Sequence, residues 1–140
     1  MSTTPIQPYL NFAGRADEAI EFYRTALKAE VEMRMTFKEN PEPEKGMPLP
    51  AGWETKVMHA SLRVAGGSLM LSDGCGPDSK GFHGFSLNYS TPDEAEARRA
   101  FAALSEGGEV DMPLMKTFYS PCFGMVTDRF GVCWMIMVPA

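Results

Sequence analysis

Residues 123–138 read "FGMVTDRFGVCWMIMV", two apolar runs separated by the turn sequence "DRFG". Aspartate and glycine favour turns, and each flanking run has the length of a strand. The second run has sulfur at every other position, in Cys133, Met135 and Met137. Because successive side chains of a strand point to opposite faces, the three sulfur atoms share one face. The sequence therefore predicts a hairpin with one uncharged, sulfur-rich face.

Two segments of the chain resemble each other. The stretch "YLNFAGRADEAIEFYRTAL" (9–27) is similar to "FSLNYSTPDEAEARRAFAAL" (85–104). Both pass from a short strand carrying Leu-Asn-aromatic into a helix that begins near "DEA". The two matches differ by one residue. The shift along the chain that aligns Leu10 with Leu87 is one residue longer than the shift that aligns Asp17 with Asp93. For the second helix we expect Thr91 as the N-cap, in a capping box completed by Glu94.

Strand patterns follow each helix. Residues 30–37 alternate, with Val31, Met33, Met35 and Phe37 on one face, and residues 57–73 form two strands around Gly66-Gly67. Residues 122–138 supply the matching hairpin of the second half. The prediction is an α+β fold of two strand–helix–three-strand modules, about 5–74 and 81–138, within a single domain over 1–140.

The bulk composition excludes several classes of function. The 140 residues carry a net charge of −5 without a basic stripe, which argues against a nucleic-acid partner or a membrane surface. The amino end lacks a charged segment followed by an apolar run, so we expect no signal peptide. Three cysteines without CxxC spacing favour free thiols in the cytoplasm.

The segment 39–55, "ENPEPEKGMPLPAGWET", is rich in proline and has little periodicity. It is predicted to be a loop. Its role stays open between a lid or contact arm and a solvated excursion. Trp53 suggests that the end of the loop packs down.

The duplicated module resembles the vicinal oxygen chelate (VOC) superfamily of glyoxalase I, bleomycin-resistance proteins and extradiol dioxygenases. The resemblance is to the PhnB-like branch, through "PYLNFAG" (8–14), "EAIEFY" (18–23), "HASLRVAGGSLMLSDG" (59–74) and "KTFYSPCFGMVTDRFGVCWMI" (116–136). It implies curled mixed sheets that enclose a cavity, and a homodimer. Some members of this branch carry the label 3-demethylubiquinone methyltransferase, but no glycine-rich loop for a methyl donor supports that chemistry here.

The resemblance also implies four metal-ligand positions, on the first and last strand of each module. Carried over, they fall on Pro8, Gly84, Leu71 and Met135. Divalent cations of this class require imidazole or carboxylate ligands, so we expect no metal and no cofactor. A slip of one residue would turn His83 inward, and neither His83 nor His59 is assigned a direction from sequence.

Without a metal, the cavity wall is expected to be apolar and rich in methionine. The candidate pocket residues are Phe12, Leu71, Asp73, Tyr119, Cys133, Met135 and Met137. The alternative is a closed core that the same methionines fill. Trp134 is expected on the opposite face, against the helix.

These features favour a cytoplasmic protein that binds a small apolar or aromatic ligand. The alternative is a VOC enzyme, glyoxalase-, lyase- or dioxygenase-like, with a divergent metal site or a metal-free site that uses His59 or His83 with Asp73. A third hypothesis is an interaction role for the 39–55 loop. No catalytic residue is assigned, and neither the ligand nor the presence of catalysis follows from the sequence.

Overall fold

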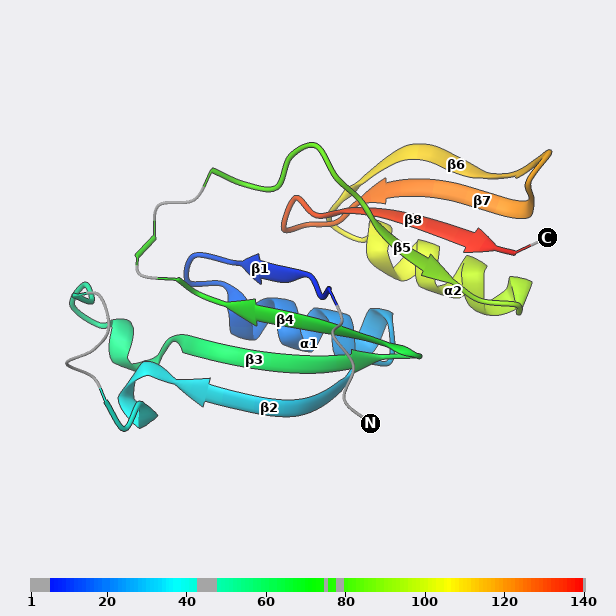
Figure 1. Cartoon of the computed structure of the whole chain (residues 1–140). Coiled ribbons are helices and arrows are strands. Elements are labelled where there is room, and N and C mark those ends of the chain that lie inside the picture. Colours follow the sequence, from blue (N-terminus) through cyan, green and yellow to red (C-terminus); the bar gives the residue numbers. More distant parts are fainter. Residues whose placement is uncertain (1–5, 43–47, 75, 78–79, 140) are drawn as a thin grey trace. The chain divides into compact units, whose positions relative to one another are not determined.

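The computed structural model describes residues 6–42, 48–74, 76–77 and 80–139. The chain divides into two compact units, residues 1–79 (unit 1) and 80–140 (unit 2). Each unit contains a four-stranded mixed sheet and an α-helix (Figure 1). The order of elements confirms the predicted α+β fold with two strand–helix–three-strand modules.

Unit 1 contains five main elements. They are β1 (Tyr9–Asn11), α1 (Ala16–Ala26), β2 (Glu30–Thr36), β3 (Val57–Val64) and β4 (Gly67–Ser72). The sheet has the order β1-β4-β3-β2, with β1 parallel to β4 and the other pairs antiparallel. Two short 3-10 turns, η1 (Phe37–Glu39) and η3 (Trp53–Thr55), belong to the connection between β2 and β3.

One face of this sheet packs against α1 and is buried. The apolar stripe of the helix is formed by Ala16, Ala19, Ile20, Tyr23 and Ala26, and the sheet contributes Leu10, Ala60, Leu62, Leu69 and Leu71. Each buried leucine side chain stabilises the fold by roughly 2 kcal/mol, which fixes the sheet against the helix. Because side chains alternate, the residues between these positions lie on the other face, which we call the open face of unit 1.

Unit 2 repeats the arrangement. Its elements are β5 (Leu87–Ser90), α2 (Glu94–Ser105), β6 (Glu109–Thr117), β7 (Ser120–Thr127) and β8 (Cys133–Val138). The sheet order is β5-β8-β7-β6, with β5 parallel to β8. The buried face of the sheet and α2 share Ala97, Ala100, Leu104, Cys122, Val126, Trp134, Ile136 and Val138.

Gly124 in β7 allows α2 to approach the sheet closely. A Cβ atom at this position would lie 2.8 Å from Phe101 Cε2 and 2.9 Å from Leu114 Cδ2. Any larger residue would therefore displace side chains in the core of unit 2.

Two local predictions are wrong, and both have a physical reason. In β2 a bulge lies between Val31, which pairs with Leu62, and Met33, which pairs with Ser61. The extra residue changes the face to which the following side chains point, so Val31 does not share a face with Met33.

The second wrong prediction concerns the start of α2. Asp93, rather than Thr91, is the N-cap, and its side chain accepts a hydrogen bond from Ala95 N at 2.9 Å. Thr91 Oγ1 instead accepts from Asp93 N, at 3.2 Å. Aspartate is as good a cap as threonine and lies closer to the helix, so the helix begins after it.

The end of the proline-rich segment packs onto unit 1, as predicted for Trp53. The indole is 7% exposed and its Nε1 donates to the carbonyl oxygen of Gly74 at 2.9 Å. Residues 43–47 of this segment lie outside the described residues. Within the described ranges, no helix is long and apolar enough to cross a membrane.

Candidate functional site

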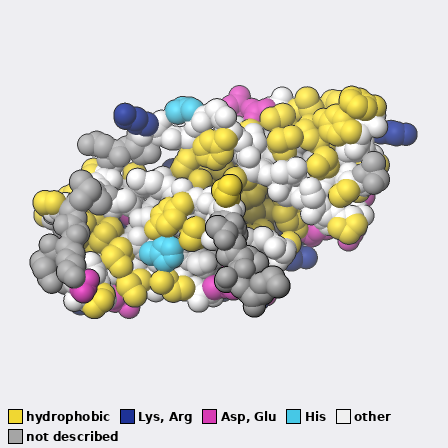
Figure 2. Space-filling view, in the orientation of Figure 1, with side chains coloured by type: hydrophobic (Ala, Val, Ile, Leu, Met, Phe, Trp, Pro, Cys, Tyr) yellow, Lys and Arg dark blue, Asp and Glu magenta, His cyan; other side chains and the backbone are white. Residues whose placement is uncertain are grey.

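In unit 2 the residues that alternate with the buried positions also lie on the other face of the sheet, which we call the open face of unit 2. This face carries a row of methionines. Met112 on β6 pairs with Met125 on β7, and Met125 pairs with Met135 on β8. Directly opposed residues of an antiparallel pair have Cβ atoms about 5 Å apart, so the three thioethers form one continuous strip. We call Met112, Met125 and Met135 the methionine row. Apolar side chains gather over β6 and β7 in Figure 2.

Other apolar groups extend this strip. Met137 pairs with Phe123, which pairs with Met115, and Cys133 lies at the other end of β8. Along β8 the sulfur residues are half-buried, whereas Trp134, Ile136 and Val138 are buried. The predicted alternation of Cys133, Met135 and Met137 on one face is therefore confirmed. That this face binds a ligand stays a prediction.

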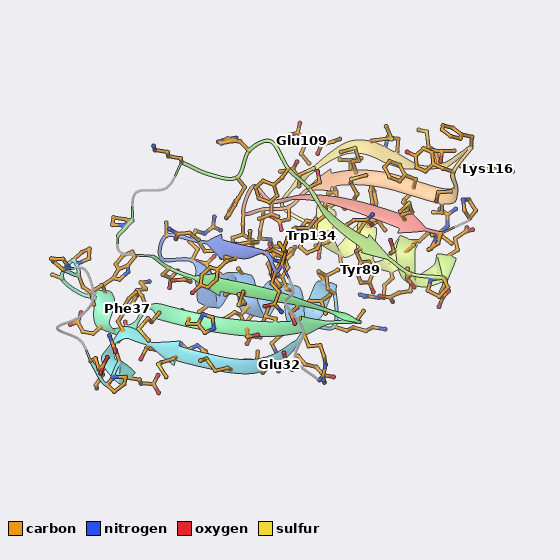
Figure 3. All side chains as sticks on the ribbon, in the orientation of Figure 1. Glu32, Phe37, Tyr89, Glu109, Lys116 and Trp134 are labelled. Carbon is orange, nitrogen blue, oxygen red and sulfur yellow. The ribbon has the colours of Figure 1, made fainter. Side chains whose placement is uncertain are left out.

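Trp134 points to the opposite face, as expected. Its indole Nε1 donates to Asp128 Oδ2 at 3.0 Å, and the ring packs in the core of unit 2. Figure 3 labels Trp134 on β8 and Tyr89 on β5, and Tyr89 pairs with Ile136. Tyr89 donates a hydrogen bond to Glu96 on α2 at 2.9 Å.

Tyr119 lies in the turn between β6 and β7. It is 43% exposed, and its ring makes an edge contact with Phe123 at 5.3 Å between centroids. Since Phe123 pairs with Met137, unit 2 brings Tyr119 to the edge of the methionine-rich face. Four of the predicted pocket residues, Tyr119, Cys133, Met135 and Met137, thus belong to one face.

Phe12 and Leu71 occupy a different environment. Leu71 is fully buried and pairs with Leu10 and Ala60 on the α1 side of the sheet. Phe12 is 6% exposed and packs edge-on against Tyr23 of α1. This placement corrects their assignment to a pocket wall, because both side chains fill the core of unit 1.

Asp73 is also a structural residue. Its carboxylate accepts hydrogen bonds from the backbone N–H groups of Gly14 (2.8 Å), Ala16 (2.7 Å) and Val57 (2.9 Å), and the residue is 1% exposed. One carboxylate therefore caps α1 and holds the start of β3. This geometry corrects the expectation of a polar anchor in a ligand pocket, since the oxygens are occupied by backbone donors.

A hydrogen-bonded pair on the open face of unit 1 was not predicted. Tyr9 Oη lies 2.8 Å from Nδ1 of His59. Burial raises the pKa of the Tyr9 phenol, an effect only partly offset by the hydrogen bond of Ser72. No sequence signal links the two residues, because they are far apart in the chain and on strands separated by β4.

The second histidine has a local partner. His83 Nε2 donates to the carbonyl oxygen of Lys80 at 2.6 Å, within the segment that precedes β5. Gly84 lies in the same segment rather than on a strand. The structure therefore places His59 on a sheet face and His83 in a connecting segment.

The strand registers also revise the predicted metal positions. Met135, which pairs with Asn88, lies on the open face of unit 2, whereas Leu71 lies on the buried face of unit 1 and its neighbour Met70, which pairs with Tyr9, lies on the open face. A phenol, an amide and two thioethers do not match the ligands of a hard or borderline divalent cation. Among the described residues, no group of three or more His, Cys, Asp or Glu side chains is arranged to hold a metal.

Comparison with known proteins places this geometry in a family. Residues 4–137 match the model of the family described as 3-demethylubiquinone-9 3-methyltransferase. The chain belongs to this family. Protein YjdN of Escherichia coli (strain K12) is 36% identical over 142 residues, covering 96% of this chain and 95% of that protein.

Solved structures agree with the assignment. Protein PA1353 from Pseudomonas aeruginosa is 42% identical, with a TM-score of 0.84 and coverage of 98% of both chains. A PhnB protein from Bacillus cereus, titled a putative 3-demethylubiquinone-9 3-methyltransferase, is 26% identical, with a TM-score of 0.78 and coverage of 96% and 99%. A glyoxylase/bleomycin resistance protein/dioxygenase domain from Frankia sp. EAN1pec shares the fold at 16% identity, with a TM-score of 0.64 and coverage of 99% and 94%. The chain is PhnB-like, and its fold is that of a glyoxylase/bleomycin resistance protein/dioxygenase domain.

Proposed function

We propose that this PhnB-like protein binds a small apolar or aromatic molecule against the methionine-rich open face of unit 2. The observation that carries the proposal is the methionine row in register across β6, β7 and β8. Thioethers are flexible and polarizable, so such a surface adapts to apolar ligands of varied shape.

The chemistry of this face supports binding rather than acid–base catalysis. The row and its neighbours Phe123, Cys133 and Met137 contain no carboxylate or imidazole. Cys133 Sγ accepts a hydrogen bond from Ser86 Oγ at 3.1 Å. A nucleophilic thiol requires an adjacent base. Thr127, which pairs with Cys133, is not one, and the carboxylate of the same row, Glu109, lies two strands away on β6.

Fluorescence titration with N-phenyl-1-naphthylamine, a neutral apolar fluorophore, tests the proposal. The Met135→Gln variant keeps the length of the side chain and replaces the thioether with an amide. We expect its affinity for the probe to fall about fivefold or more, because the amide must be desolvated when the probe covers it.

Met33→Gln is the matched control. Met33 lies at the edge strand of unit 1 and is 42% exposed. Its substitution should leave the affinity for the probe unchanged. Equal affinities of the wild type and Met135→Gln would contradict the proposal, as would an absence of probe binding to the wild-type protein.

The proposal requires no metal. Elemental analysis of protein purified without chelator is expected to give substoichiometric Ni, Zn, Fe and Mn. Stoichiometric metal would favour the alternative, a VOC enzyme with a divergent site.

A cytoplasmic homodimer remains part of the proposal. Closed two-fold pairs are the commonest oligomers. Size-exclusion chromatography should give twice the chain mass of 15.4 kDa. Elution at the mass of a single chain would refute the dimer without affecting ligand binding by unit 2.

A further inference from the structure

We propose that the Tyr9–His59 pair on the open face of unit 1 is a binding site for the carboxylate of a small aliphatic acid. Nε2–H of His59 is the donor to the carboxylate. The site lies on a different sheet from the methionine row and does not rest on the function proposed above.

The sheet register holds the two side chains together. Tyr9 pairs with Met70 on β4, and Met70 pairs with Ser61 on β3. His59 precedes Ser61 by two residues and therefore shares its face. The tyrosine ring reaches across β4 to the imidazole, with 5.5 Å between the ring centroids and 37° between the planes.

The hydrogen bond determines which imidazole nitrogen carries the proton. The 2.8 Å contact between Tyr9 Oη and Nδ1 of His59 fits donation in either direction, and the proposal assigns the phenol, which is protonated at neutral pH, as the donor to Nδ1. A neutral ring then carries its proton on Nε2, and a protonated ring carries one on both nitrogens. In either state Nε2–H is a donor.

The surroundings favour an acid with an alkyl chain. Tyr9 is 51% exposed and His59 is half-buried, so the pair is accessible. Met35 pairs with His59, and Met70 lies next to Tyr9, which gives apolar contacts on both sides.

The charged groups on this face do not compete for the imidazole. Arg63 lies on the same face of β3 and forms ion pairs with Glu30 and, at 3.6 Å, with Glu32. Within the described part of the chain, Nε2 of His59 makes no hydrogen bond with a side chain or backbone group. A carboxylate that approaches Nε2 therefore meets an N–H donor that is not already bound to an acidic side chain of the described residues.

Imidazole nitrogen NMR tests the first part of the proposal. The chain has two histidines, so a two-bond ¹H–¹⁵N spectrum of the full-length protein is simple, and His83→Phe assigns its signals. We expect the Nε2–H tautomer for neutral His59. Tyr9→Phe should shift the equilibrium toward a mixture, whereas Tyr119→Phe should leave it unchanged. A predominant Nδ1–H tautomer in the wild type would overturn the proposal.

Titration with sodium hexanoate tests the second part. Hexanoate should shift the His59 ring signals, and His59→Phe should weaken its binding, measured by calorimetry, about tenfold. His83→Phe and Met135→Gln should bind hexanoate like the wild type, which separates this site from the face of unit 2. Hexylammonium presents the same chain with a donor headgroup and should not bind. Binding of both probes with equal affinity, or of hexanoate equally to His59→Phe, would overturn the proposal.

Discussion

Among the described residues, Asp73 of unit 1 and Asp128 of unit 2 are buried and accept N–H hydrogen bonds, but the two carboxylates connect different parts of the chain. Asp73 is 1% exposed and binds backbone groups from the β1–α1 turn, the first residue of α1 and the first residue of β3. Asp128 is 3% exposed and accepts hydrogen bonds from Phe130 N, Val132 N and Trp134 Nε1. Unit 1 therefore depends on a long-range tie, whereas unit 2 uses a local turn.

The difference follows from how each helix begins. In unit 2 the N-cap Asp93 comes directly before α2, so no distant carboxylate is needed. In unit 1 the residue before α1 is Arg15, which makes no side-chain cap. Asp73 supplies that cap from the end of β4 and so links the helix to the sheet.

The largest expected effect comes from Asp73→Ala. Removing the carboxylate leaves three buried backbone donors without their partner, and hydrogen bonds to charged groups contribute about 1.5–3 kcal/mol each. Since water can satisfy some of these donors, we expect a loss of about 3–4 kcal/mol in the free energy of unfolding, measured by urea denaturation. Asp17→Ala is the control, because its exposed ion pair with Arg34 contributes less than about 1 kcal/mol. Similar losses in both variants would refute the long-range tie.

Asp128→Ala should destabilise less than Asp73→Ala, by about 2–3 kcal/mol. The donors that bind Asp128 are close to it in the sequence, so removing its carboxylate does not separate distant parts of the chain. The indole N–H resonance of Trp134 should move toward the position of a solvent-bonded indole. Asp111→Ala provides the comparison in the same unit, because Asp111 is exposed and bonds to Thr127 Oγ1 at 2.6 Å. If Asp128→Ala costs more stability than Asp73→Ala, the ranking of the two aspartates is wrong.

The two tryptophans extend the comparison at smaller magnitude. Trp134 Nε1 donates to a carboxylate and Trp53 Nε1 donates to a carbonyl. Charge-assisted hydrogen bonds are the stronger class. We expect Trp134→Phe to cost about 2–3 kcal/mol and Trp53→Phe about 1–2 kcal/mol in urea denaturation, with part of each loss due to the smaller ring. The reverse order would show that packing, not the acceptor, sets the difference.

The order of elements was predictable because it follows from local patterns. The hairpins around Gly66-Gly67 and "DRFG" combine strand periodicity with turn residues, and the structure has β3–β4 and β7–β8 there. The face of β8 was predictable for the same reason, since alternation of Cys133, Met135 and Met137 needs only the period of a strand.

Residues whose role depends on distant partners were not predictable. Leu71 was assigned to a cavity wall together with Met135, whereas the pairing of β4 with β1 and β3 places it with Leu10 and Ala60 on the buried face of unit 1. The role of Asp73 was not predictable because the backbone groups that donate to it lie far away in the sequence. The Tyr9–His59 pair joins strands separated by β4, so only the sheet register brings it together.

The smallest expected effect concerns Tyr89, the buried-side counterpart of the open-face Tyr9. Burial, followed by the hydrogen bond and negative charge of Glu96, raises the pKa of Tyr89 to about 12. The unfolded phenol ionises near pH 10. Because the folded state holds this proton more tightly, its contribution to stability is complete below pH 10 and is lost as the pH rises through about 12.

Spectrophotometric titration of tyrosinate absorbance at alkaline pH measures this directly. We expect Tyr89→Phe to remove one ionisation step near pH 12, and Glu96→Gln to shift that step to lower pH because the negative charge is gone. Tyr119→Phe is the control, since that ring is exposed in the β6–β7 turn. If Glu96→Gln leaves the ionisation step in place, burial alone raises the pKa of Tyr89. The hydrogen bond from Tyr89 to Glu96 on α2 would then contribute nothing to that shift.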